Sequence, residues 1–158
     1  MVRQLELSAR SSEIVVEFGD IRKEDPLEKS KEIANIIAGW FNAAVQGDGT
    51  YAGKHLSQRP TMLLVGTDPK EWLRGKAATE FLSNEARESG GRVKVNVGQV
   101  EAYKEGSVGW GIAHPTIRLP NGKQFQPRWS AVFHKERGRW KIVQIHASVG
   151  VPNEQVLG

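Results

Sequence analysis

Hydrophobic positions early in the chain recur at the spacing of an α-helix. Apolar side chains fall every three or four residues and form one broad stripe, made of Ile33, Ile36, Ile37, Trp40, Phe41, Ala44 and Val45. Upstream, Asp25, Pro26 and Glu28 match a helix-capping sequence, and Gly47 is a typical helix end. We therefore predict a long helix from Asp25 to Gly47 that packs its stripe on a sheet.

Shorter elements are predicted in the middle of the chain. Residues 61–65 form a short apolar run typical of a buried strand. Residues 68–73 repeat the capping arrangement and predict a short helix, which Gly75 ends. A further amphipathic helix follows and ends at Gly90.

Everything after Arg92 is predicted to be strand. Apolar and polar residues alternate, and the phase of the alternation switches near Gly98, which indicates a β-bulge. Three tight connections then separate four β-prone runs, at residues 105–106, 120–122 and 136–138. Helices followed by an antiparallel meander predict the α+β class, with one domain over residues 25–158 and residues 1–24 as an N-terminal extension.

Composition excludes several kinds of protein. The chain has no cysteine, so it has no disulfide or thiolate chemistry. Its net charge is +4, but basic residues are scattered among acids, so we expect no nucleic-acid partner; only the C-terminal half is locally basic. No apolar run is long enough for a membrane span, and four scattered histidines do not predict a metal site. We expect a cytoplasmic protein without a cofactor.

The final predicted strand, residues 140–148, is apolar on both alternating faces and carries His146 and Ser148. With the turn before Trp140, it resembles the C-terminal signature of the nuclear-transport-factor-2-like superfamily, which includes SnoaL-like and ketosteroid-isomerase-like domains. The resemblance covers about residues 25–152. It implies a cone-shaped α+β roll of cystatin-like fold, in which N-terminal helices pack on a strongly bent antiparallel sheet and close an apolar pocket.

Strand parity assigns the two faces of the last hairpin. One face carries Trp129, Ala131, Phe133, Val143, Ile145, Ala147 and Val149, and we expect it to form the core. The other mixes polar residues with Trp140 and Ile142, which is typical of the centre of a dimer interface. We therefore predict a homodimer through this sheet face.

Carboxylate catalysis is not favoured by the sequence. Enzymes of the superfamily resemble one another in placing a carboxylate in the pocket, whereas this chain has no acid between Ser107 and Lys135 or on its last strand. A general base must reach its proton directly or through one water. Asp48 and Glu101 stay open as alternatives.

Histidine, arginine and tryptophan are the remaining candidates for ligand binding. His55, His114 and His146 are candidates because histidine as a residue type can exchange a proton near neutral pH, and Arg128 needs an acid, a set of carbonyl groups or an anionic ligand if it is buried. Trp40 and Trp129 are expected to supply apolar walls. Simple structural roles are the alternative for each residue, including a salt bridge from Arg128 to Glu71 or Glu80.

The sequence therefore predicts a SnoaL-like domain that binds a small neutral or anionic molecule in an aromatic pocket with a histidine and arginine end. Two alternatives stay open. One is a lyase, dehydratase or isomerase that uses a histidine general base. The other is a dimerising interaction module without a ligand.

Overall fold

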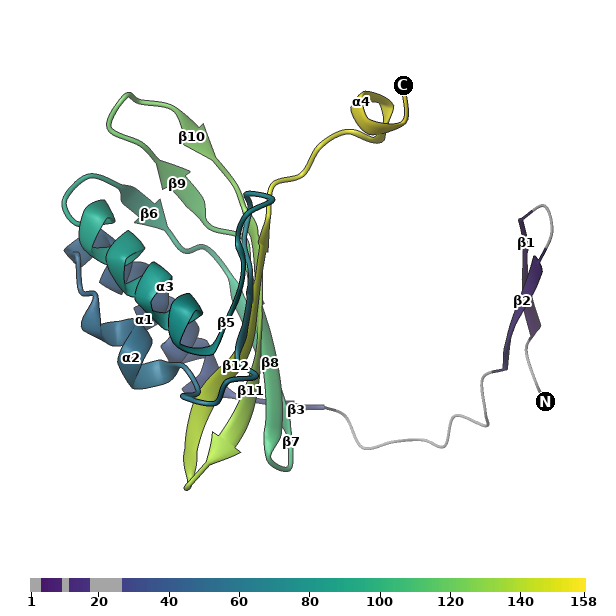
Figure 1. The fold of residues 1–158 in the computed structure, drawn as a ribbon, viewed down its shortest axis with the longest axis horizontal. Coiled ribbons are helices and arrows are strands. Elements are labelled where there is room, and N and C mark those ends of the chain that lie inside the picture. Colours follow the sequence, from purple (N-terminus) through teal and green to yellow (C-terminus); the bar gives the residue numbers. More distant parts are fainter. Residues whose placement is uncertain (1–3, 10–11, 18–26) are drawn as a thin grey trace.

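The computed structural model of the chain describes residues 4–9, 12–17 and 27–158. Near the N-terminus, strands β1 (Gln4–Ala9) and β2 (Ser12–Glu17) pair antiparallel as a two-stranded sheet. The predicted helix start at Asp25 and Pro26 lies outside the described residues. From Leu27 onward the chain forms helices packed against a strongly bent sheet, which confirms the predicted α+β class (Figure 1).

The main sheet has seven strands. In spatial order they are β3 (Glu28–Lys29), β7 (Val100–Glu105), β8 (Val108–Ala113), β11 (Arg128–Glu136), β12 (Arg139–Ser148), β4 (Leu63–Val65) and β5 (Trp72–Arg74). Neighbours are antiparallel except β12 and β4, which are parallel. A second sheet of three strands contains β10 (Gln124–Phe125), β9 (Thr116–Arg118) and β6 (Lys94–Asn96). It stands on the same side of the main sheet as the helices (Figure 1).

Three helices cover one face of the main sheet: α1 (Lys31–Gln46), α2 (Thr50–His55) and α3 (Gly75–Ser89). A short fourth helix, α4 (Asn153–Leu157), follows the last strand. Below, "inner face" means the face of the main sheet toward α1–α3, and "outer face" means the opposite one.

Helix α1 begins later than predicted. Residues 28–29 are the strand β3, and Ser30 is the N-cap: its side-chain oxygen accepts a hydrogen bond from the backbone N–H of Ile33 at 3.2 Å. The backbone N–H of Ser30 also donates to the carbonyl of Ala102 on β7 at 2.9 Å, which anchors the helix start to the sheet. The predicted end is confirmed, because Gly47 closes α1 in the left-handed conformation with φ of 72°.

The predicted short helix over residues 68–73 is wrong. Asp68 does cap the backbone, accepting from the N–H of Lys70 at 2.8 Å, but it caps a turn. Trp72 and Leu73 then form β5, because the edge of β4 offers them backbone partners. An aspartate before a turn and an aspartate before a helix make the same local hydrogen bonds, so pairing with a distant strand decided the outcome.

Glycines on β8 let helix α1 approach the sheet. A Cβ at Gly109 would overlap the end of the Ile33 side chain, and one at Gly111 would overlap that of Ile37. Both isoleucines are fully buried. The absence of a side chain at these two positions therefore lets α1 pack directly on β8.

The predicted faces of β12 are wrong at Trp140 and Ile142. Val132 on β11 lies opposite Gln144, but Phe133 lies opposite Ile142, so a β-bulge places one extra residue in β12. The bulge reverses the phase of the strand, and Trp140 and Ile142 therefore share the inner face with Ile145. Trp140 is 3% exposed and Ile142 is fully buried.

No helix within the described ranges is long and apolar enough to cross a membrane.

Candidate functional site: an aromatic cavity with carboxylates

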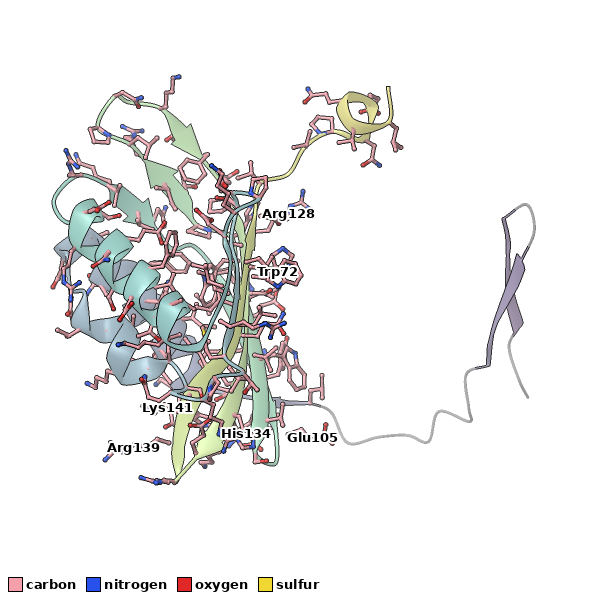
Figure 2. All side chains as sticks on the ribbon, viewed as in Figure 1. Trp72, Glu105, Arg128, His134, Arg139 and Lys141 are labelled. Carbon is pink, nitrogen blue, oxygen red and sulfur yellow. The ribbon has the colours of Figure 1, made fainter. Side chains whose placement is uncertain are left out.

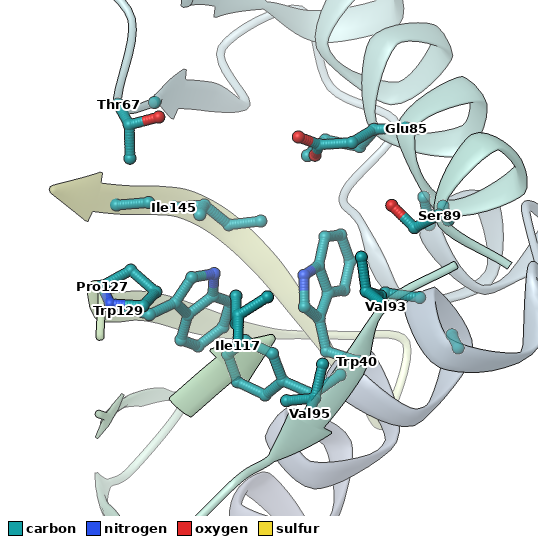
Figure 3. Close-up of a pocket in the computed structure, with 18 of the residues that line it drawn as sticks. Trp40, Thr67, Glu85, Ser89, Val93, Val95, Ile117, Pro127, Trp129 and Ile145 are labelled. Carbon is teal, nitrogen blue, oxygen red and sulfur yellow. The ribbon is translucent and has the colours of Figure 1, made fainter. Parts of the chain in front are cut away.

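A cavity of about 290 Å³ opens between the helices and the inner face of the sheet (Figure 3). Helices α1 and α3 form one wall, strands β11 and β12 form another, and the three-stranded sheet borders the mouth. Most of the lining is apolar: Trp40, Phe41, Phe81, Leu82, Val93, Val95, Ile117, Leu119, Phe125, Trp129 and Ile145 are among its members. The volume is at the small end of the range for ligand pockets, roughly 300–1,000 Å³.

Two tryptophans form the aromatic wall of the cavity. The ring centroids of Trp40 and Trp129 lie 6.2 Å apart, and Phe41 meets Trp129 edge-on at 5.5 Å. Trp129 is only 5% exposed, because β8 and β12 flank it and α1 covers it. Tyr51 adds an edge-on contact to Trp40 at 6.2 Å. The wall is therefore fixed by packing between the first helix and the sheet.

Three carboxylates supply the charge on the cavity lining: Asp48, Glu71 and Glu85. Asp48 follows the end of α1 and accepts hydrogen bonds from the backbone N–H of Thr50 at 2.9 Å and from its hydroxyl at 2.6 Å. These bonds lower the pKa of Asp48. A carboxylate oxygen of Glu71 accepts from the N–H of Asp68 at 3.2 Å. Both groups are thus held by their own loops.

Glu85 is the third carboxylate, and no ion pair within the described part of the chain involves it. It projects from α3 into the space bordered by Thr67, Ile145 and Trp40 (Figure 3). Glu85 is an exposed residue, open to solvent on one side of the cavity. The surrounding protein nevertheless raises the pKa of Glu85 above its ordinary value, first through burial and then through the negative charges of Glu71 and Glu88. A raised pKa in an apolar cleft marks a candidate functional group.

The structure separates the residues that the sequence proposed as ligand-binding. Trp40 and Trp129 line the cavity. His114, Arg128 and His146 lie together in a shallow groove on the outer face, beside Ser130 and Ser148. His55 lies in another groove, beside Lys54 and Lys141. Among the described residues that line the cavity there is no histidine, lysine or arginine.

Arg128 was a candidate because a buried arginine would need a charged or polar partner, but it is not buried. It is exposed on the outer face, and no ion pair within the described part of the chain involves it, so the alternative pairing with Glu71 or Glu80 is not formed. Glu80 instead pairs with Lys76 on its own helix at 3.4 Å. Pro127 and Trp129, which flank Arg128, are buried, but strand alternation turns Arg128 itself to solvent.

Sequence reasoning missed Glu85, although a signal was present. Phe81, Glu85 and Ser89 follow one another at intervals of four residues, which places them on one side of a helix. All three line the cavity. An acid in register with the apolar stripe of α3 could therefore have been recognised. Of the acids left open, Asp48 lines the cavity, whereas Glu101 lies in the outer-face groove.

The part of the chain that the structure describes contains no candidate metal site. No group of three or more histidine, aspartate or glutamate side chains gathers there closely enough to hold an ion.

Comparisons with known proteins agree with this architecture. Residues 33–152 match the family model described as the SnoaL-like domain. A nuclear-transport-factor-2-like protein of unknown function from Pseudomonas putida has a TM-score of 0.68 at 15% identity, covering 78% of this chain and 88% of that one. No curated protein matches this chain.

Two further solved structures have similar folds. A putative calcium/calmodulin-dependent protein kinase II association domain from Xanthomonas campestris has a TM-score of 0.62 at 19% identity, covering 79% of this chain and 96% of that one. A putative ketosteroid isomerase from Parabacteroides distasonis has a TM-score of 0.61 at 12% identity, covering 80% and 97%. At such identities the likeness concerns the fold.

Proposed function

This chain belongs to the SnoaL-like domain family, and we propose that it binds a small, mostly apolar molecule that presents an amine or hydroxyl group to Glu85. The observation that carries the proposal is a carboxylate of raised pKa placed in an aromatic cavity. A largely apolar pocket with a few polar groups is the usual form of a small-molecule site.

The charge of the lining argues for the class of ligand. A neutral or anionic ligand was expected because Arg128 and three histidines were available, but these side chains line other surfaces. Asp48, Glu71 and Glu85 make the cavity electronegative. An anionic ligand would be repelled and would lose its hydration, whereas a cation or a hydrogen-bond donor would be paired. The aromatic faces of Trp40 and Trp129 also favour a cation.

A matched series of ligands tests this assignment. Benzylamine, benzyl alcohol and benzoate share one ring and differ in the polar group, so calorimetric titration with each isolates the charge preference. We expect the amine to bind best and benzoate worst. Glu85→Gln is expected to weaken the binding of benzylamine by about tenfold, as for the loss of one charged hydrogen bond. The affinity for benzyl alcohol should stay nearly unchanged.

The pH dependence has a defined sign. Ionised Glu85 attracts an ammonium group, so amine affinity is expected to rise as the pH increases toward the raised pKa of Glu85 and to level off above it. Glu85→Gln should remove this rise. The control is Glu80→Gln, which changes an exposed carboxylate on the same helix outside the cavity. Tighter binding of benzoate than of benzylamine would overturn the assignment.

A second candidate function is acid–base catalysis by Glu85. The raised pKa favours it, because a general acid or base works best when its pKa is close to the working pH. With a substrate in hand, Glu85→Gln is expected to abolish turnover. His114→Ala should leave it intact, because His114 lies on the outer face. The opposite pattern would restore the histidine-based alternative.

The outer face carries an apolar patch that fits a second copy of the chain. The patch has two parts. On β8, Val108 and Ile112 are exposed by 43% and 51%, with half-buried Trp110 and Val132 beside them, and on β5 Trp72 is exposed by 62%. Ser130, His146 and Val65 lie between Ile112 and Trp72 in the sheet register. Trp72 projects from the outer face, away from the helices (Figure 2). Covering Trp72 and Ile112 would contribute about 1.5–3 kcal/mol for each side chain. This patch replaces Trp140 and Ile142 as the centre of the proposed interface.

Charges at the two edges of the outer face support pairing with a second copy. Glu101 and Glu105 lie on β7 near one edge, and Arg74 lies on β5 at the other. A twofold axis that runs along the strands between two outer faces would set β7 of one copy against β5 of its partner. Opposite charges would then meet at both rims. Association domains occur among the structures of similar fold.

The dimer is tested by introducing a charge at the patch. We expect the wild-type chain to sediment as a dimer at micromolar concentration and Ile112→Glu to shift it to the monomer, because an unpaired charge would be buried in the interface. Ala77→Glu, on the exposed side of α3, is the control and should stay dimeric. A monomeric wild type would overturn the proposal.

A further inference from the structure

A second groove lies between α2 and the start of β12, and we propose that it binds the phosphate group of a small phosphorylated molecule. We call it the α2 groove. The polar side chains that line it include Tyr51, Lys54, His55, Arg139, Lys141 and Glu32. Tyr51 lines both this groove and the aromatic cavity, but the carboxylates of the cavity do not line the groove.

The aromatic wall of the α2 groove is held by packing and a hydrogen bond. The imidazole of His55 stacks on the ring of Tyr51, with centroids 4.1 Å apart and planes at 29°. The hydroxyl of Tyr51 donates to the carbonyl of Ile36 on α1 at 3.0 Å. His55 is half-buried as a result. One edge of the imidazole therefore faces the groove from a fixed position.

Three basic side chains line this wall from two parts of the chain. Lys54 comes from α2, and Arg139 and Lys141 come from β12. The ammonium group of Lys141 donates to the carbonyl of Lys54, which ties strand and helix together. Glu32 is the single acid on the lining within the described residues, and no ion pair joins it to these cations there. The groove is thus positive by about two charges before any ligand enters.

The positive charge of the groove affects the pKa of His55. Burial lowers its pKa below 6.5, and the positive charges of Lys54 and Lys141 lower it further. Bringing like charges together costs free energy, which an anion in the groove would recover. A dianionic phosphate matches the surplus, and the guanidinium of Arg139 can bind two of its oxygens at once. The groups that face His55 are Glu32, Tyr51, Lys54, Arg139 and Lys141.

The wider surface shows how the fold builds this site. Lys135, Arg137, Arg139 and Lys141 lie close together in the sequence, and the hairpin between β11 and β12 keeps them on one surface. Arg139 and Lys141 lie there, at the end opposite Arg128 (Figure 2). The adjoining groove adds Lys135, Arg137 and Arg59, the last of which pairs with Glu136 at 3.3 Å. These cations would draw an anion toward the α2 groove.

His55 itself reports the test. We expect the pKa of His55, followed by NMR through its imidazole protons, to rise when inorganic phosphate is added at constant ionic strength. Phenyl phosphate is expected to act at lower concentration than inorganic phosphate, because its ring can lie against Tyr51. Phenol, its neutral analogue, should have no effect. His114, in the outer-face groove, provides an internal control in every spectrum.

Variants separate a specific site from general attraction. Arg139 is exposed, and Arg139→Gln is expected to weaken the binding of phenyl phosphate by about tenfold or more. Arg118→Gln, exposed on β9, removes the same charge elsewhere and should change the affinity by less than twofold. Glu85→Gln should have no effect, so this outcome is independent of the ligand proposed for the cavity.

Three outcomes would overturn the proposal. The first is an unchanged His55 pKa in millimolar phosphate. The second is an equal loss of affinity in Arg118→Gln and Arg139→Gln, which would indicate unspecific attraction. The third is binding of single-stranded oligonucleotides without binding of phenyl phosphate, which would assign the surface to nucleic acid.

Discussion

Replacing Trp129 with alanine is expected to destabilise the protein by about 3–5 kcal/mol, the usual cost of deleting a buried tryptophan. Trp129 is 5% exposed at the centre of the sheet, where it contacts Trp40 and Phe41. Its removal would leave a hole continuous with the cavity, since β8 and β12 fix the backbone on both sides. For a chain of this size the melting temperature should fall by roughly 6–20 °C.

The same substitution should affect the cavity. A binding site without its aromatic wall loses contact area, so the affinity for benzylamine is expected to fall even under conditions in which the variant stays folded. Trp129→Phe keeps an aromatic ring and should lose much less stability. A melting temperature for Trp129→Ala within 2 °C of the wild type would contradict the packing described for this wall.

Replacing Gly111 with valine is expected to destabilise the protein by about 1–3 kcal/mol, the usual range for overpacking a core. Even a Cβ at this position overlaps the end of Ile37 and lies 3.0 Å from the carbonyl oxygen of Glu101. Ile37 is fully buried and cannot move away freely. Helix α1 would have to lift from the sheet, which would displace Trp40 from the cavity. Thermal melting and benzylamine titration measure the two effects.

Gly53 provides a matched control for Gly111. It lies on the exposed side of α2, where a Cβ would meet nothing within 4 Å. Gly53→Ala is therefore expected to be neutral or to stabilise the protein by up to about 1 kcal/mol, since alanine favours helix. If Gly111→Val melted at the wild-type temperature, the close approach of α1 to β8 would be wrong.

Local sequence was sufficient where one segment decides its own structure. The apolar stripe of α1, the glycine at its end and the alternation on β11 were all correctly interpreted, because helix and strand periodicities depend on near neighbours. It was insufficient at Trp72, where pairing with β4 converted a capped turn into a strand. A long-range hydrogen-bonding partner cannot be recognised from the capping residues alone.

The candidate site shows the same division. Trp40 and Trp129 were expected to line the pocket and do line the cavity. The histidines and Arg128 were grouped with them because they are the side chains with suitable chemistry, but chemistry does not reveal direction. The bulge in β12 reversed the phase of half a strand, and strand alternation turned Arg128 outward. Glu85 was overlooked because an acid on a helix is usually solvated.

The sequence by itself determined the class of the fold and the long helix before Gly47, since both follow from periodicity, and the resemblance of the final strand indicated the family. Residue type also indicated the aromatic character of the cavity. Tertiary structure alone decided which polar groups meet. It turned Glu85 into an apolar cavity, gathered Lys54 with Arg139 and Lys141 across more than eighty residues of sequence, and set the two sheet faces apart. Charges interact through space, so their partners depend on strand register and helix placement.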